Sequence, residues 1–176
     1  LDTLWRGELV WGRVHDENAD AMGGVAGHAG LFSTALDLSV FARAMLAGGT
    51  APPCTPPGES GEPCPAPRRE AVALARPDLV AAFTTRADST ATRALGWDTP
   101  GEQTSAGDYL TARAYGHTGF TGVSLWLDPE LDLWVVLLTN RVHPSRANQK
   151  HVALRRAVHD AVALAIADRP LERRLP

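Results

Sequence analysis

Two stretches of the chain repeat apolar residues at the three- and four-residue spacing of an amphipathic helix. In the first stretch, Thr34 is a suitable N-cap with Asp37 three residues later, and Gly48-Gly49 is a suitable end. The apolar positions between them are Leu38, Phe41, Met45 and Leu46. We therefore predict an amphipathic helix from Thr34 to about Gly48.

The second helical stretch covers about residues 146–168. One stripe of this helix is predicted to be apolar and carries Leu154, Val158, Ala161 and Ala165. Charged side chains lie toward the opposite side, at Arg155, Arg156 and Asp160. The pattern predicts a terminal helix that packs on one face of a sheet.

The strongest strand pattern lies between these helices, at residues 120–127 and 133–139. The turn-rich spacer Asp128-Pro129-Glu130-Leu131-Asp132 separates the two runs and has the length of a hairpin loop. The second run is apolar on both faces, which indicates a central strand covered on two sides. Helices and a hairpin together predict an α/β fold of the α+β type, in which helices pack on an antiparallel sheet.

Weaker patterns predict three more elements. Leu95-Gly96-Trp97 indicates a short strand, and residues 100–108 indicate a turn. A short helix is predicted around residues 70–83, with an interruption near Pro77.

Prolines crowd the segment at about residues 50–69. Because proline cannot donate a hydrogen bond to a helix or a sheet, this segment is predicted to be an exposed loop or insertion. Cys54 and Cys64 lie in it, and their positions are compatible with a disulfide and equally with two free thiols.

Length and charge exclude several classes of protein. With 176 residues, the chain fits one domain or a large piece of a larger one. Its net charge of −3 gives no electrostatic reason to expect a nucleic acid or an anionic membrane as a partner. No run approaches the roughly 20 apolar residues of a membrane-spanning helix, so no transmembrane segment is predicted.

The segment Tyr115–Gly122 is the strongest candidate for a functional site. It reads Tyr-Gly-His-Thr-Gly-Phe-Thr-Gly and leads into an apolar run. Its glycines at positions 116, 119 and 122 predict a strand edge with uncovered backbone amides that a substrate can approach closely. Such an edge supplies one half of an acyl-transfer site, and a nucleophile with its base supplies the other half.

His117-Thr118-Gly119 resembles the third motif of the serine β-lactamase and penicillin-binding-protein superfamily, which usually reads Lys-Thr-Gly or Lys-Ser-Gly. Histidine in the first place is similar to the variant of some DD-peptidase and esterase-like members. Other segments resemble the class C-like branch of β-lactamase-related serine hydrolases, at residues 14–19, 27–35, 95–98 and 137–141. The resemblance covers most of residues 10–165 apart from the proline-rich loop.

This resemblance implies a fold and roles for particular residues. The fold would be part of the α-β-α sandwich of β-lactamases and DD-peptidases, with residues 1–176 as the C-terminal portion of a single domain. His117 would tune the electrostatics of the pocket, and Thr118 and Gly119 would bind substrate. The backbone N–H of Phe120 would be an oxyanion-hole donor. The substrate would be a small-molecule or peptidoglycan-like acyl compound, and the protein would be periplasmic or otherwise extracytoplasmic.

The nucleophile motifs of that superfamily are absent from this sequence. Lys150 is the only lysine, and the residue three before it is Ala147, so there is no Ser-x-x-Lys motif. Neither Tyr109 nor Tyr115 is followed by asparagine two positions later. Both motifs precede the third one in the superfamily, and the sequence does not begin with Met. We therefore expect a fragment, inactive alone, of a serine hydrolase that attacks ester, amide or β-lactam carbonyls through an acyl-enzyme.

Other sources of chemistry fit the sequence less well. Ser124 lies inside a predicted strand and lacks the closing glycine of a nucleophile elbow. His151 and His159 are about two helical turns apart, so neither a metal nor another cofactor is expected. Residues 15–18 are expected to form a hydrogen-bonded loop near the rim of the site. Two alternatives stay open: a non-catalytic ligand-binding domain of the same fold, and an unrelated α+β interaction domain.

Overall fold

The computed structural model describes residues 6–51, 53, 70–88, 90–102, 104–168 and 171–174. Within these residues the helices are α1 (Glu17–Ala21), α2 (Ala35–Leu46), α3 (Pro77–Thr84) and α4 (His151–Leu164). The strands are β1 (Thr50–Ala51), β2 (Val72–Ala73), β3 (Tyr115–Thr118), β4 (Ser124–Asp128) and β5 (Leu133–Leu137). Cys54 and Cys64 lie outside the described residues, as does most of the proline-rich loop. None of the described helices is long and apolar enough to cross a membrane.

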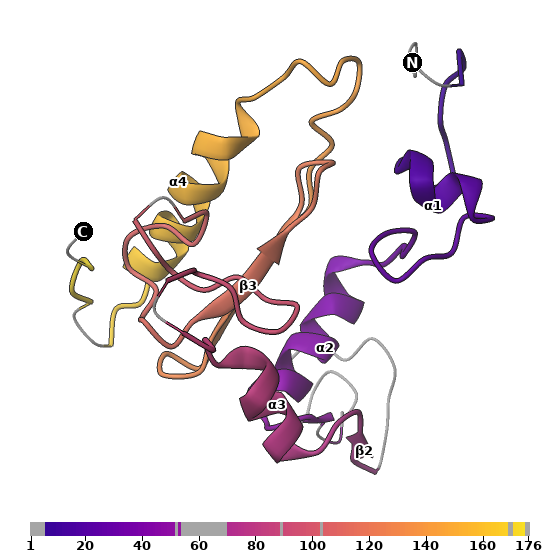
Figure 1. Cartoon of the computed structure of the whole chain (residues 1–176). Coiled ribbons are helices and arrows are strands. Elements are labelled where there is room, and N and C mark those ends of the chain that lie inside the picture. Colours follow the sequence, from indigo (N-terminus) through magenta and orange to yellow (C-terminus); the bar gives the residue numbers. More distant parts are fainter. Residues whose placement is uncertain are drawn as a thin grey trace, which may run out of the picture.

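A three-stranded antiparallel sheet forms the centre of the fold, in the order β3-β4-β5. The helix α2 packs on one face of this sheet and α4 on the other (Figure 1). This helix–sheet–helix arrangement confirms the predicted α+β class. The prediction of a central strand at 133–139 was wrong, because β4 is central and β5 lies at an edge among the described strands. β5 is apolar on both faces because a helix packs on each face, and this pattern does not show how many strands pair with β5.

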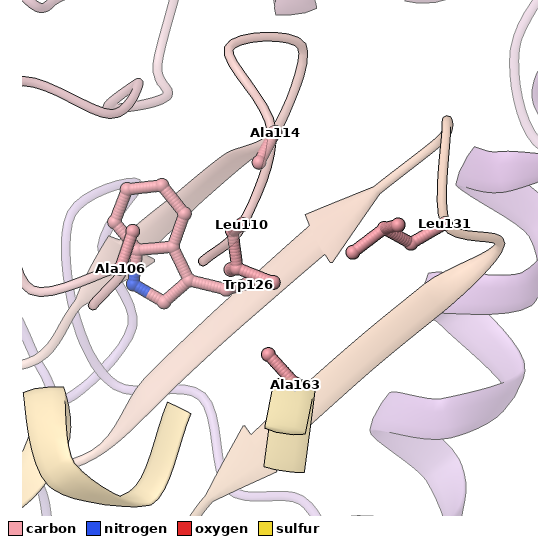
Figure 2. Close-up of a cluster of buried hydrophobic side chains, with 6 residues drawn as sticks. All are labelled: Ala106, Leu110, Ala114, Trp126, Leu131 and Ala163. Atoms are coloured by element: carbon pink, nitrogen blue, oxygen red, sulfur yellow. The ribbon is translucent and has the colours of Figure 1, made fainter. Parts of the chain in front are cut away.

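Neighbouring residues of β4 point to opposite faces of the sheet, and two separate clusters of buried side chains result. Trp126 packs on the α4 face with Leu110, Leu131 and Ala163 of α4 (Figure 2). The next residue, Leu127, packs on the α2 face in a smaller cluster with Ala42 and Tyr115. The sheet is therefore the shared wall of both clusters.

The helix α2 confirms its sequence prediction. The Thr34 hydroxyl accepts a hydrogen bond from the Asp37 amide at 3.1 Å, and the helix ends at Leu46 just before two glycines with positive φ, 70° at Gly48 and 93° at Gly49. Its fully buried residues, however, are two alanines, Ala42 and Ala44. Small side chains let the helix approach the sheet closely.

The predicted apolar stripe of α4 was wrong. The buried residues of this helix are Arg155, His159 and Ala163, which follow each other at four-residue spacing. The predicted stripe residue Leu154 is 46% exposed. Hydropathy predicted the wrong face of this helix to be buried. The face that is buried carries two polar side chains, and their hydrogen-bond partners come from distant parts of the chain.

Three predicted boundaries also differ from the structure. Gly96 has φ of 78° in a turn, and the pairing near it is limited to isolated bridges, which join Asp98 to Arg93 and to Gly116 of β3. Pro77 begins α3 because its fixed φ and missing N–H suit the first helical position. The strand predicted at 120–127 begins only at Ser124, because residues 119–122 form a turn.

Candidate functional site

The turn between β3 and β4 carries the residues that the sequence marks as a site. His117 and Thr118 end β3 and pair with Leu125 and Ser124 of β4. The His117 side chain is exposed, on the face that also carries Leu125, and Thr118 is half-buried. The structure therefore keeps this motif at the surface, at one end of an edge strand.

The three glycines around the motif do not leave their own amides uncovered, so that prediction was wrong. Gly116 donates to the Asp98 carbonyl at 2.9 Å, Gly119 to Val123 at 2.9 Å, and Gly122 to Gly119 at 3.1 Å. Their small size serves internal geometry instead. A Cβ on Gly116 would lie 2.4 Å from the Trp126 ring, and the φ of 116° at Gly122 suits glycine alone.

The backbone N–H of Phe120 is one of the groups that this turn leaves available. Among the described residues it has no hydrogen-bond acceptor, while the amides of Gly119 and Gly122 in the same turn are engaged. The Phe120 side chain is 60% exposed, so solvent or a ligand can reach this position. An uncommitted amide at a rigid turn is a suitable donor for an oxyanion.

Two buried arginines hold the carbonyl groups of the same turn. Arg155 of α4 donates to the carbonyls of Gly119 at 2.6 Å, Val123 at 2.8 Å and Gly122 at 3.2 Å. Arg141 donates through Nε to the Phe120 carbonyl at 2.7 Å. Because the carbonyl oxygens are bound by the arginines, the turn is fixed without use of the Phe120 N–H.

These arginines also place positive charge behind the Phe120 amide. Arg155 is 6% exposed and Arg141 is 8% exposed. In the described part of the chain, no carboxylate pairs with Arg155. Burial, with a smaller contribution from Arg141, lowers the pKa of Arg155 from its usual value. Two guanidiniums in a low-dielectric setting favour a negative charge at this turn.

His117 is held from two sides. Its Nδ1 lies 2.9 Å from the Thr118 carbonyl, which can only accept, so Nδ1 carries the proton. Its Nε2 then accepts from Arg93 Nη1, at 2.9 Å. The guanidinium of Arg93 therefore places a permanent positive charge next to His117.

The amino-terminal segment forms the rim of the turn. The ring of His15 stacks on Phe120 with centroids 5.7 Å apart, and the guanidinium of Arg141 lies 4.1 Å from the centre of the same ring. Asp16 caps α1 through the Ala19 amide and contacts His28 at 2.9 Å. The loop expected at 15–18 is only partly present, because residues 17 and 18 belong to α1 and Asp16 is its N-cap. His15, just before this cap, lies beside the candidate donor.

Two other groups near the motif are unsuited to proton transfer. Burial raises the pKa of Tyr115 to about 12, so its phenol stays protonated. Ser124 Oγ lies 3.3 Å from His159 Nε2, a pairing that resembles a nucleophile and its base. Both side chains are buried, 3% and 0% exposed, and His159 Nδ1 donates to the Ser105 carbonyl at 2.6 Å. A substrate cannot reach this pair, so it serves to join α4 to the sheet.

The sequence did not indicate Arg93, Arg141 or Arg155. Each acts on the motif across 20 or more residues of chain, and arginine is common throughout this sequence. No group of three His, Cys, Asp or Glu side chains able to hold a metal ion occurs among the described residues.

Comparison with known proteins fits this geometry. The Beta-lactamase family matches residues 3–160. Proteins of Salmonella paratyphi B, Salmonella newport and Salmonella heidelberg, each named "Putative D-alanyl-D-alanine carboxypeptidase", are 38% identical over 149 residues. The match covers 82% of this chain and 30% of each relative, so the chain spans less than a third of their length. With its family match over nearly the whole sequence, the chain belongs to the beta-lactamase family.

Proposed function

We propose that this chain supplies the oxyanion side of a serine hydrolase site that acts on ester, amide or β-lactam carbonyls through an acyl-enzyme. The Phe120 N–H carries this proposal, because it is uncommitted while arginines fix the carbonyls around it. Membership of a hydrolase family supports the same chemistry.

In the proposed reaction, a serine attacks the substrate carbonyl and its oxygen becomes negatively charged. The Phe120 N–H would bind this oxygen, and the guanidiniums of Arg141 and Arg155 would stabilise its charge from behind the turn. One such donor contributes about 3–4 kcal/mol to transition-state stabilisation in comparable sites. Thr118 and Gly119 would position the substrate along β3.

We further propose that the substrate is a peptidoglycan-like peptide that ends in a free carboxylate. Arg93 supports this substrate, because it is a permanent cation beside His117 whose side chain is 61% exposed, and its one described carboxylate contact, to Asp98, is long at 3.9 Å. The name of the Salmonella relatives, carboxypeptidase, describes an enzyme for such a chain end. This substrate would place the protein outside the cytoplasm.

The nucleophile is proposed to come from polypeptide outside this sequence, because the sequence contains no Ser-x-x-Lys motif. The chain alone should therefore not hydrolyse nitrocefin or a p-nitrophenyl ester faster than buffer does. Turnover by the purified chain that an active-serine reagent abolishes would contradict this part of the proposal.

A chimera tests the oxyanion role directly. The 149 matching residues of a Salmonella relative are replaced by the corresponding residues of this chain. Release of D-alanine from an acylated peptide ending in D-Ala-D-Ala is then measured. We expect activity, and we expect Phe120→Pro to reduce kcat by about a hundredfold or more, because proline has no N–H.

Phe120→Ala is the matched control, because it removes the exposed ring but keeps the amide. It should retain most of the kcat, and the melting temperatures of both variants show whether the turn survives. Equal kcat for Phe120→Pro and the unchanged chimera would refute the oxyanion role. A folded chimera that binds the peptide without releasing D-alanine would favour a non-catalytic ligand-binding domain.

A further inference from the structure

A cavity lies away from the β3–β4 turn, and most of the charged residues that line it are arginines. Its volume is about 700 Å³. The charged residues around it are Arg86, Glu102, Asp108, Arg156, Arg173 and Arg174. They come from the segment after α3, the loops before β3, the helix α4 and the segment at 171–174. None belongs to residues 115–123, so this cavity is separate from the candidate hydrolase site.

One carboxylate holds two of the four arginines. Asp108 Oδ1 accepts from Arg156 at 2.6 Å, and Asp108 Oδ2 accepts from Arg173 at 2.6 Å and 3.0 Å. The hydrogen bond from Arg173 is the main cause of the lowered pKa of Asp108. Both oxygens of this carboxylate are therefore occupied, and its charge is shared between two cations.

The other two arginines bind only neutral oxygens in the described part of the chain. Arg86 donates to Thr99 Oγ1 at 2.8 Å and to the Pro100 carbonyl at 2.6 Å. Arg174 donates to the Gly107 carbonyl. With four arginines and two carboxylates, the lining carries an excess of two positive charges.

Arg174 gives an independent sign that an acceptor belongs here. Its Nε is buried and has no hydrogen-bond partner among the described residues. A buried donor without a partner is unfavourable. Burial is the main cause of the lowered pKa of Arg174, while the charges of Asp108, Asp160 and Asp128 act in the opposite direction. A bound anion would accept a hydrogen bond from this donor.

We propose that this cavity binds a small dianion with phosphate or dicarboxylate chemistry. Guanidinium groups match the planar, paired oxygens of such anions, and charge-assisted hydrogen bonds to them are about twice as strong as neutral ones. The volume lies within the range of about 300–1,000 Å³ that is typical of ligand sites. The excess of arginines over carboxylates in the lining suits an anionic ligand, although Asp160, outside the lining, offsets part of the charge of Arg174.

Titration of this chain with inorganic phosphate tests the proposal, and succinate in a parallel titration distinguishes phosphate from dicarboxylate chemistry. Binding is followed by calorimetry and by amide NMR shifts at constant ionic strength. We expect saturable binding of at least one of the two anions, with shifts at the amides of Gly101 and Ala112, which line the cavity. Arg174→Gln should weaken it by roughly tenfold or more, as expected for the loss of a charged donor.

Arg76→Gln is the matched control, because Arg76 is exposed, pairs with Asp78 and lies outside the cavity lining. It should leave the affinity unchanged. If Arg174→Gln does not fold, Arg86→Gln serves in its place and should weaken binding similarly. Absence of saturable binding of either anion, or equal weakening by Arg76→Gln, would overturn the proposal. The measurement involves no hydrolysis, so its outcome is independent of the proposed hydrolase function.

Discussion

The two faces of the central sheet differ in how they hold their helices. On the α2 face, the contacts are apolar and involve Ala42, Tyr115 and Leu127. On the α4 face, the cluster around Trp126 continues into a polar layer made by Arg155 and His159 of α4. One strand, β4, serves both faces by simple alternation of its side chains.

This difference separates two tasks. Apolar contacts stabilise a fold but are non-directional, so they cannot orient a peptide group. Hydrogen bonds from a buried guanidinium are directional, and on the α4 face they fix the carbonyls of the turn that presents the Phe120 N–H. We therefore expect the apolar cluster on the α2 face to contribute stability alone, and the polar layer on the α4 face to contribute stability and the geometry of the turn.

The largest effect is expected from Trp126→Ala on the α4 face. Trp126 is 0% exposed, and its removal should lower the free energy of unfolding by about 4 kcal/mol through lost burial and a cavity. Urea denaturation followed by circular dichroism measures the change. Trp11 is 88% exposed, so Trp11→Ala should change stability by less than about 0.5 kcal/mol.

Leu127→Ala tests the α2 face and should cost about 3 kcal/mol. The side chain is fully buried but contacts no residue of the turn. Hydrogen exchange at Gly119 and Gly122, compared with global stability, should therefore be unchanged. A selective rise in exchange at these glycines would mean that the two faces do not act separately.

Arg155→Met should cost about 2 kcal/mol, because three carbonyls lose a charged donor. Unlike Leu127→Ala, it should also speed hydrogen exchange at Gly119 and Gly122 beyond the global effect. Arg156→Met is a matched control on the same helix, since Arg156 contacts Asp108 and Thr104 and not the turn. Equal hydrogen exchange at Gly119 and Gly122 in both variants would show that Arg155 does not position the turn.

The smallest expected effect is a pH dependence of stability, which comes from His159 on the α4 face. Burial lowers the pKa of His159, so its neutral form is favoured in the folded state. Its contribution to stability is full above the unfolded-state pKa near 6.5, and it is lost as the pH falls through the lowered folded-state value. His159→Gln should flatten the decline in melting temperature below about pH 6.5.

The pKa of His151 is lowered as well, again through burial first, but His151 is only half-buried, at the start of α4. His151→Gln should therefore flatten the decline less than His159→Gln does. The reverse order would show that acid acts on the helix start and not on the buried polar layer.

Local patterns predicted the fold class well, whereas the roles of the candidate site residues stay predictions. The capping of α2 by Thr34 and the hairpin of β4 and β5 depend on neighbours in sequence, and both were predicted. The motif at His117–Gly119 was predicted on a strand edge, and its first two residues end β3, an outer strand of the described sheet. The orientation of α4 was missed because burial of Arg155 depends on carbonyls more than 30 residues away. Arg93 was missed for the same reason, since 24 residues separate it from His117.

The position of Trp126 has a practical consequence for spectroscopy. Its indole N–H donates to Ser105 Oγ at 3.1 Å, and its ring meets His159 edge-on with centroids 6.5 Å apart. A protonated imidazole quenches indole emission, whereas a neutral one quenches it less. The sequence has five tryptophans, so the emission lost in Trp126→Phe identifies the part that reports the charge on His159 and the attachment of α4 to the sheet.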